Sequence, residues 1–269
     1  MSRASLATIA PIGHLMPMSE THDILVQSQF GPTAQAYVAS AVHAEGADLV
    51  HIAARAAALR PAHALDLGCG GGHVAYALAP HAARVTACDL SAQMTGAVAA
   101  EAARRALPNI ETAVAPAEAL PFAAATFDFL ACRFSAHHWG DLPAGLGEAR
   151  RVLAPGAPAL FADVIAPPLA AADSHLQAVE LLRDPSHARD YSEAEWRRLL
   201  EQAGFTIRSV ITARLRMDFA SWTARMRTPP EQAAAIRALQ SLASAEVADH
   251  FAIEPDGSFT IDTVLIEAV

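Results

Sequence analysis

The chain contains no lysine, and all 19 of its basic residues are arginine. Enzymes that form a Schiff base need a lysine amine, and the phosphate-binding loop of Walker-type nucleotidases carries a lysine. Both kinds of chemistry are therefore excluded. No basic cluster is longer than two residues and the net charge is −9, so we do not expect a nucleic acid as partner.

Cysteine is also scarce. The three cysteines, Cys69, Cys88 and Cys132, are far apart and form no CxxC pair. We therefore expect neither a disulfide framework nor a structural zinc site, which suits a reducing cytoplasm. The 12 histidines contain no HExxH or HxxxH arrangement, so no metal site is expected.

Long apolar runs are missing as well: none approaches the roughly 20 residues of an integral membrane span. The N-terminal stretch is a poor signal peptide. Hydrophobic residues make up 53% of the 269 residues, which is enough for the packed core of one domain. We place this domain at 28–269, after an arm at 1–27, and interpret 1–17 as an upstream extension or a disordered arm.

The most informative stretch is 65–72, with the sequence LDLGCGGG. It reads as a short apolar strand that enters a glycine-rich turn and then a helix. Residues without Cβ can take positive φ and let a ligand approach the backbone closely. The next expected strand ends in Asp89, where a carboxylate can hold a ribose. This pattern predicts a nucleotide-type ligand.

Strands alternate with helices through the middle of the chain, which favours βαβ crossovers. We expect an α/β fold with a Rossmann-like, doubly wound, mostly parallel seven-stranded sheet, an antiparallel last strand and helical lid insertions. Ligands of such sheets lie at the carboxyl ends of the strands. The expected strands are 63–67, 84–89, 110–115, 126–133, 159–164, 205–212 and 258–268, the last two forming an antiparallel hairpin.

Two segments are candidate substrate lids: a cap at 167–191 and a long insertion at 214–257. Within the insertion, Thr228 is expected to cap a helix that starts at Pro229 and Pro230. The alternative is that this helix only packs on the sheet edge. A further helix is expected from 33 to 58, with a break at Gly46.

Four segments in order resemble class I S-adenosylmethionine-dependent methyltransferases, the small-molecule group that includes the ubiquinone and menaquinone biosynthesis C-methyltransferases. The resemblance covers about 28–212. Its motifs are LDLGCGGG at 65–72, Asp89-Leu90-Ser91 with Met94, AEALPF at 117–122 and EARRVLAPG at 148–156.

The resemblance implies roles for individual residues. Asp89 accepts both ribose hydroxyls, and Asp66 orders the loop or reaches the methionyl ammonium through water. Pro116 departs from the family pattern, because a polar residue that binds the adenine amino group commonly stands there. The cofactor-binding residues implied are Asp66, Gly68, Cys69, Gly70, Asp89, Leu90, Met94, Ala117, Glu118 and Arg133.

Candidate bases follow the fourth strand, since methylation of a phenol or a ring carbon requires loss of a proton. Of the adjacent His137 and His138, we favour His138 as the one that faces the cavity, with the other in a structural hydrogen bond. A structural role stays open for each. His187 in the cap is a second-rank candidate. Arg133 either holds an acidic group or pairs with Asp163, and we prefer the pair.

The resemblance implies an S-adenosylmethionine-dependent methyltransferase acting by in-line displacement on a small, aromatic or otherwise apolar acceptor. One alternative is an NAD-linked oxidoreductase, which uses a related glycine loop; the segment Glu118–Phe122 favours the methyltransferase. The other is a catalytically silent cofactor-binding module. A homodimer, the identity of the acceptor and the atom that is methylated stay open.

Overall fold

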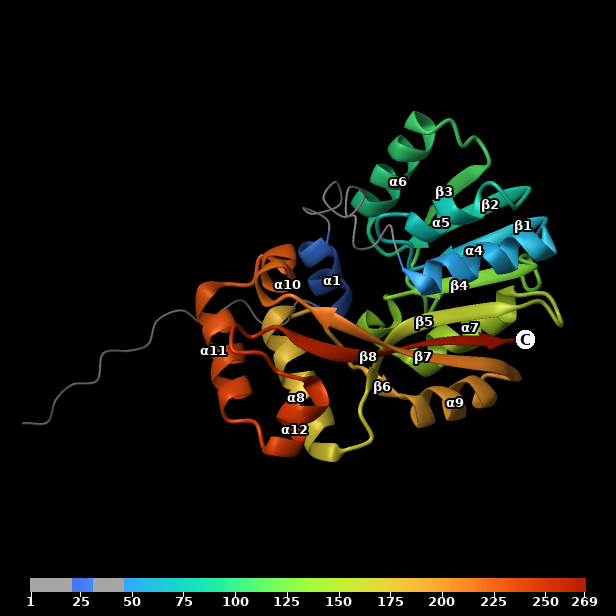
Figure 1. Cartoon of the computed structure of the whole chain (residues 1–269). Helices are drawn as coiled ribbons and strands as arrows, with labels where there is room; N and C mark the ends of the chain where they lie inside the picture. Colours follow the sequence, from blue (N-terminus) through green and yellow to red (C-terminus); the bar gives the residue numbers. More distant parts are fainter. Residues whose placement is uncertain (1–20, 31–45) are drawn as a thin grey trace, which may run out of the picture.

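The structure is a computed structural model that describes residues 21–30 and 46–269. A single mixed sheet forms its centre, with helices on both faces and a group of helices at one end (Figure 1). The expected arm at 1–27 extends into the first helix, α1 (His22–Phe30), and its other residues up to 20 lie outside the described ranges. Across the described residues, no helix has the length and apolar character needed to cross a bilayer.

The sheet confirms the expected fold class. Its strand order is β3-β2-β1-β4-β5-β8-β7, and the short β6 pairs with β5 outside this path. Neighbours from β3 to β5 are parallel, whereas β8 runs antiparallel to both β5 and β7. The strands are β1 (His63–Leu67), β2 (Arg84–Asp89), β3 (Ile110–Val114), β4 (Phe129–Arg133), β5 (Ala159–Ala166), β6 (Tyr191–Ser192), β7 (Ile207–Met217) and β8 (Phe259–Ala268).

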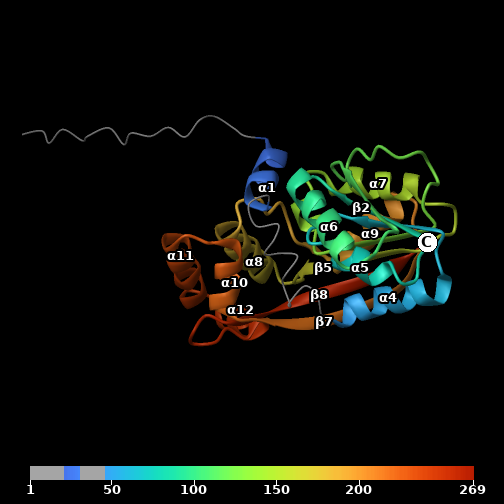
Figure 2. The same ribbon diagram turned by 90° about the horizontal axis from the view of Figure 1, so that it is seen from above.

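Central strands are buried on both faces, which is why β1 and β5 read as nearly continuous apolar runs. One face packs against α4 (Ala47–Leu59), α5 (His73–Leu78) and α6 (Ala92–Arg104). The other packs against α7 (Leu142–Val152) and α9 (Glu193–Gln202). The resulting three layers are visible in Figures 1 and 2.

Local sequence signals begin several of these helices. The Ser91 hydroxyl accepts from the Met94 N–H at the start of α6, and Asp141 accepts from Ala144 N–H at the start of α7. At α9, Ser192 and Glu195 form a reciprocal capping box. These caps fix where the helices begin, and therefore where the strand-end loops lie.

Besides the cores on the two faces of the sheet, a further hydrophobic core lies under the helical group at one end of the β7–β8 hairpin (Figure 2). It combines residues of α8 and of the segment between β7 and β8, so the cap and the insertion pack together. The apolar side chains include Leu176, Trp222, Ile236 and Phe251. The helices are α8 (Ala170–Arg183), α10 (Phe219–Met226), α11 (Pro230–Ser241) and α12 (Ala245–Phe251).

The hairpin and its insertion differ in detail from expectation. The β7 strand continues to Met217, because its pairing with β8 runs to Phe259. The insertion therefore starts after 217 rather than at 214. The prediction that Thr228 caps the next helix is wrong: the N-cap of α11 is Pro229, and the Thr228 hydroxyl donates to the Arg183 carbonyl instead. Of the expected helix 33–58, the described part is α4, and 33–45 lie outside the described residues.

Candidate functional site

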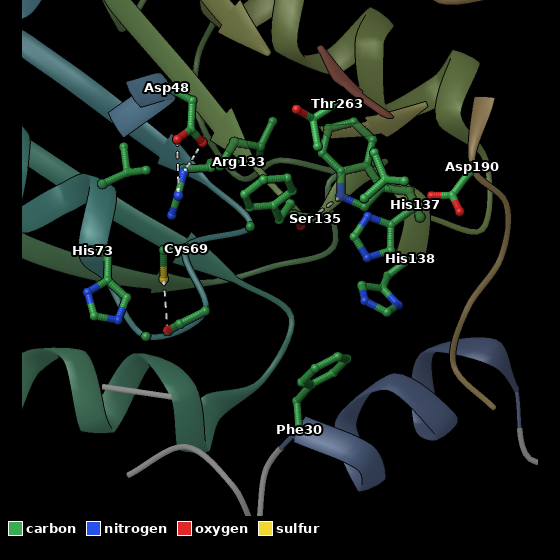
Figure 3. A pocket seen from close by; sticks show the side chains of 18 of the residues that line it. Phe30, Asp48, Cys69, His73, Arg133, Ser135, His137, His138, Asp190 and Thr263 are labelled. Atoms are coloured by element: carbon green, nitrogen blue, oxygen red, sulfur yellow. Dashed lines mark hydrogen bonds and ion pairs between the residues drawn. The ribbon is translucent and has the colours of Figure 1, made fainter. Parts of the chain in front are cut away.

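A cavity of about 600 Å³ lies at the carboxyl ends of the strands, within the size range of small-molecule sites. We name its two parts by their residues. The glycine-loop end is formed by cavity-lining residues from the segments 66–74, 89–94 and 115–118. The histidine end is formed by cavity-lining residues from 133–140, by Glu180, Arg183, Asp184 and Asp190 of the cap, and by Trp222, Arg225 and Met226 of α10. Figure 3 shows Cys69 and His73 on one side, and His137, His138 and Asp190 on the other.

The glycine loop has the conformation that its sequence predicts. Gly68 and Gly70 take φ of +70° and +47°, which side chains rarely adopt. A Cβ on Gly68 would collide with the Ser135 side chain, so the loop packs directly on the segment after β4. A Cβ on Gly70 would meet no atom of the described residues within 4 Å, because this backbone faces the cavity. The loop is thus both tightly seated and open to a ligand.

Two carboxylates support this loop, the buried Asp66 and the half-buried Asp89. Asp89 accepts the Gly70 N–H at 2.8 Å through one oxygen and the Ser91 N–H at 2.9 Å through the other. Each oxygen keeps a lone pair for a ligand. Burial raises the pKa of Asp89, and the two N–H groups oppose this rise. Asp66 accepts the Ala75 N–H at 2.9 Å, and burial raises its pKa to about 7.

The remaining expected residues of this end also line the cavity. Leu90 is half-buried, and the buried Met94 packs against Phe30 of α1. Glu118 accepts the Asp141 N–H at 3.1 Å, which holds its carboxylate in place. The cavity wall also includes Cys69, Pro116 and Ala117.

The fourth motif has a structural function. Glu148 accepts the Leu120 N–H at 2.8 Å and pairs with Arg151. Arg151 in turn donates to the carbonyls of Leu120 and Phe122. The two side chains on α7 therefore clamp the loop at 120–122, which follows the cavity-lining residues 115–118. This explains why AEALPF and EARR occur together.

At the histidine end, His137 forms a pair with Asp163. Its Nδ1 lies 2.6 Å from Asp163 Oδ1, and its backbone N–H also donates to this carboxylate. Burial alone would lower the pKa of His137, but the charge and hydrogen bond of Asp163 outweigh it and raise the pKa to about 9. His137 is therefore an imidazolium at neutral pH, and its Nε2 has no hydrogen bond among the described residues.

His138, in contrast, is uncharged at neutral pH. Burial, and secondly the charge of His137, lower its pKa to about 4, so the ring is neutral at pH 7. A neutral ring must carry its proton on Nδ1, because this atom lies 3.0 Å from the Ser186 carbonyl oxygen. The ring also meets Phe30 edge-on, with centroids 4.9 Å apart (Figure 3). Both histidines line the cavity.

His187 is buried outside the cavity wall. Its Nε2 lies 3.0 Å from Gln177 Oε1, and burial together with the neighbouring charges lowers its pKa to about 2. A neutral ring that donates to Gln177 holds the cap together. The geometry thus gives no direct route from His187 to a ligand in the cavity.

The prediction that Arg133 pairs with Asp163 is wrong. Arg133 pairs with Asp48 of α4, not with Asp163 (Figure 3), because Asp163 is already engaged with His137. The guanidinium also lies over the Phe134 ring at 4.8 Å. This pair links α4 to the end of β4 beside the glycine loop.

Comparison with known proteins identifies the group to which this chain belongs. Residues 65–161 match the methyltransferase domain family. The chain is 43% identical over 201 residues to the uncharacterized protein YafE of Escherichia coli, covering 75% of this chain and 97% of YafE. It is 30% identical over 249 residues to the uncharacterized methyltransferase YcgJ of Bacillus subtilis, covering 90% of this chain and 98% of YcgJ. The chain belongs to the methyltransferase family.

This methyltransferase also shares its fold with solved relatives. The crystal structure of a putative methyltransferase from Bacillus halodurans superimposes with a TM-score of 0.79 at 30% identity, covering 83% of this chain and 98% of that one. A shorter match links the chain to the ubiquinone/menaquinone biosynthesis C-methyltransferase of Paracoccus denitrificans, at 39% identity over 98 residues, 35% of this chain and 39% of that protein. The resemblance seen in the motifs is confirmed.

The enzyme is an S-adenosylmethionine-dependent methyltransferase, and its residues fit that cofactor. The open face at Gly70 leaves room for the methionyl part, and the two free lone pairs of Asp89 suit a pair of ribose hydroxyls. The alternative assignment as an NAD-linked oxidoreductase is therefore rejected. Among the described residues, no group of three His, Cys, Asp or Glu side chains is placed to hold a metal ion, and the three cysteines are free and buried.

Several cavity residues of the methyltransferase were missed by sequence reasoning. Asp48 and Asp190 come from segments without a recognisable motif, and Trp222 lies in the insertion. Asp163 lies outside the cavity wall, and its pairing with His137 was not predicted. One signal was available: Asp184 and Asp190 flank His187 in the cap, and such a density of ionisable groups in a predicted lid indicates a polar cavity wall.

Proposed function

We propose that the acceptor is a small aromatic molecule with an acidic hydroxyl group, such as a phenol or a quinol, methylated on carbon or on that oxygen. The observation that carries this proposal is the His137–Asp163 pair, which presents a cationic Nε2 without a partner among the described residues. An anionic oxygen is the ligand that such a group stabilises.

The walls of the histidine end support an aromatic acceptor. Aromatic rings of Phe30, Phe134, Trp139 and Trp222 line it, together with the thioether of Met226. Flat apolar rings pack well against such side chains. The partial match to a quinone C-methyltransferase is consistent with this class of acceptor.

We further propose that the cap and the insertion act together as the acceptor lid. Glu180, Arg183 and Asp184 reach the cavity from the cap, and Trp222 and Met226 reach it from α10. Since these helices share their own apolar core, they can shape the acceptor pocket without disturbing the glycine loop. This arrangement favours the lid interpretation over a helix that only packs on the sheet edge.

The chemistry follows from the charge states of the two histidines. Bound S-adenosylmethionine supplies an electrophilic methyl group. The imidazolium of His137 has no lone pair to accept a proton, so the acceptor hydroxyl releases its proton to solvent on binding; the Nε2–H of His137 then donates to the resulting oxyanion, and the nucleophile keeps its anionic character. Asp163 holds the ring in one orientation. The neutral His138 donates to the Ser186 carbonyl and fixes the cap loop against His137. We therefore assign the stabilisation of the acceptor oxygen to His137, although the sequence favoured His138.

A methyl-transfer screen tests the proposal. The enzyme is incubated with S-adenosylmethionine and 1,4-dihydroxynaphthalene, catechol or 4-hydroxybenzoate, and S-adenosylhomocysteine and methylated product are measured by mass spectrometry. We expect turnover with at least one hydroxyaromatic compound. Transfer only to the carboxylate of an aliphatic acid, with no binding of any hydroxyaromatic compound, would contradict the assignment.

A further inference from the structure

Asp190 is a buried carboxyl group that lines the histidine end of the cavity. It is 1% exposed, and its Oδ2 has no hydrogen-bond partner among the described residues. A buried polar group without a partner is costly, and most such groups in native proteins have a ligand or a water as partner. The side chain lies beside His137 in Figure 3.

Within the described part of the chain, Asp190 has no charged partner at ion-pair distance. His187 Nε2 is 3.9 Å from Asp190 Oδ2, but this ring is neutral and bonds to Gln177. Burial raises the pKa of Asp190 well above its usual range; the charges of His137 and Arg183 oppose this rise, and those of Glu180 and Asp163 add to it. The unpartnered Oδ2 of this carboxyl group can accept a polar hydrogen from a ligand.

The protein holds Asp190 in a fixed position relative to His137. The Gln177 side chain accepts the Asp190 N–H at 3.1 Å and donates to the Asp190 carbonyl at 2.8 Å. The carbonyl of His137 accepts the N–H groups of Ala188 and Arg189. The cap loop is thus bonded directly to the residue proposed to face the reacting oxygen.

We propose that Asp190 determines acceptor specificity by binding a second polar hydrogen, a hydroxyl or amino group, on the same ring whose oxygen faces His137. This inference rests on the proposed function. It narrows the acceptor class from simple phenols to dihydroxylated or amino-hydroxylated rings. A site built to bond a hydroxyl rejects an analogue that lacks it, because its own buried group is then left unpaired.

The test compares 1-naphthol with 1,2-, 1,3- and 1,4-dihydroxynaphthalene under anaerobic conditions. Binding to the enzyme saturated with S-adenosylhomocysteine is followed by tryptophan fluorescence, since Trp139 and Trp222 line the cavity, and methyl transfer is measured in parallel. We expect at least one diol to bind about tenfold more tightly than 1-naphthol or better. Asp190→Leu should bring this ratio close to one and Asp190→Asn should reduce it, with the affinity for S-adenosylhomocysteine unchanged in both.

Asp173→Asn is the matched control. Asp173 bonds Gln177 and Arg189 next to the same loop but does not line the cavity, so the variant should keep the wild-type preference. A diol preference that survives in both Asp190 variants would overturn the inference while leaving the proposed function intact. A wild-type enzyme that binds S-adenosylhomocysteine but none of the four naphthols would overturn the proposed function, and this inference with it.

Discussion

At the glycine-loop end, carboxylates pair with backbone N–H groups that are close in the chain, whereas at the histidine end the two imidazole rings pair with groups from distant segments. Asp66 and Asp89 bond to N–H groups 2 to 19 residues away. His137 and His138 find their partners 26 and 48 residues away. The first end is therefore specified within short motifs, and the second only by the packing of the cap on the sheet.

The two ends also differ in how completely their polar groups are satisfied. Each oxygen of Asp89 already has one protein donor, so the glycine loop is held in shape by the protein itself. The histidine end contains an imidazolium Nε2 and a carboxyl oxygen of Asp190 without partners among the described residues. A preformed end suits a constant cofactor, and an end with open polar groups suits selection of a particular acceptor.

Replacing His137 should give the largest effect. His137→Gln keeps a side chain of similar reach but loses the positive charge, so we expect kcat with a hydroxyaromatic acceptor to fall roughly 100- to 1,000-fold. Affinity for S-adenosylhomocysteine, measured by calorimetry, should not change. His187→Gln is the control outside the cavity, and equal losses in both variants would remove His137 from the chemistry.

Replacing Asp66 should change stability at neutral pH. The folded-state pKa of about 7 lies above the ordinary 3.8, so the folded protein retains the proton while the unfolded chain releases it. Stability is then lost as pH rises from about 4 to 7, by roughly 3 kcal/mol. Urea unfolding of Asp66→Asn should lack this loss. Asp218→Asn, at an exposed helix cap, should retain it; a wild-type curve that is flat over this range would contradict the prediction.

The third prediction compares two carboxylates that accept backbone N–H groups: Asp89, which lines the cavity, and Asp128, which does not. Asp89→Ala should weaken S-adenosylmethionine and S-adenosylhomocysteine by about 1.5–3 kcal/mol, which is roughly 10- to 150-fold. Asp128 makes a similar pair of bonds, to the N–H groups of Ala62 and His63, but does not line the cavity. Asp128→Ala should therefore keep wild-type affinity in calorimetry. If both variants lost the same affinity, the loss would reflect damage to the fold and not a lost contact between Asp89 and the ligand.

The smallest expected effect is a shift in the pH dependence of kcat/KM for the acceptor. His137 has a raised pKa, so it is cationic below about pH 9 and loses its charge above; kcat/KM for the acceptor should fall there. Asp163→Asn removes the charge that raises the pKa and should move this descending limb about 1–3 units lower. A limb that stays at pH 9 in this variant would show that another group titrates, and comparison with His137→Gln would identify whether His137 is involved.

Much of the fold was readable because its signals are local. Alternation of apolar strands with capped helices predicted the sheet, and the hairpin of 205–212 with 258–268 was confirmed as β7 and β8. Errors occurred where a side chain had a choice of partners. Arg133 pairs with Asp48, 85 residues away, and Thr228 bonds to Arg183 rather than capping α11. Sequence order does not tell which distant group is nearest.

The sequence by itself determined the class of this protein, a Rossmann-like S-adenosylmethionine-dependent methyltransferase, and predicted its glycine loop and the carboxylate of Asp89 as the cofactor site. It could do so because positive φ at Gly68 and Gly70 and a carboxylate at a strand end are requirements of a few consecutive residues. The tertiary structure decided the charges at the other end. Only packing brings Asp163 to His137 and buries His138 and Asp190, and burial and neighbouring charge are what set their pKa values.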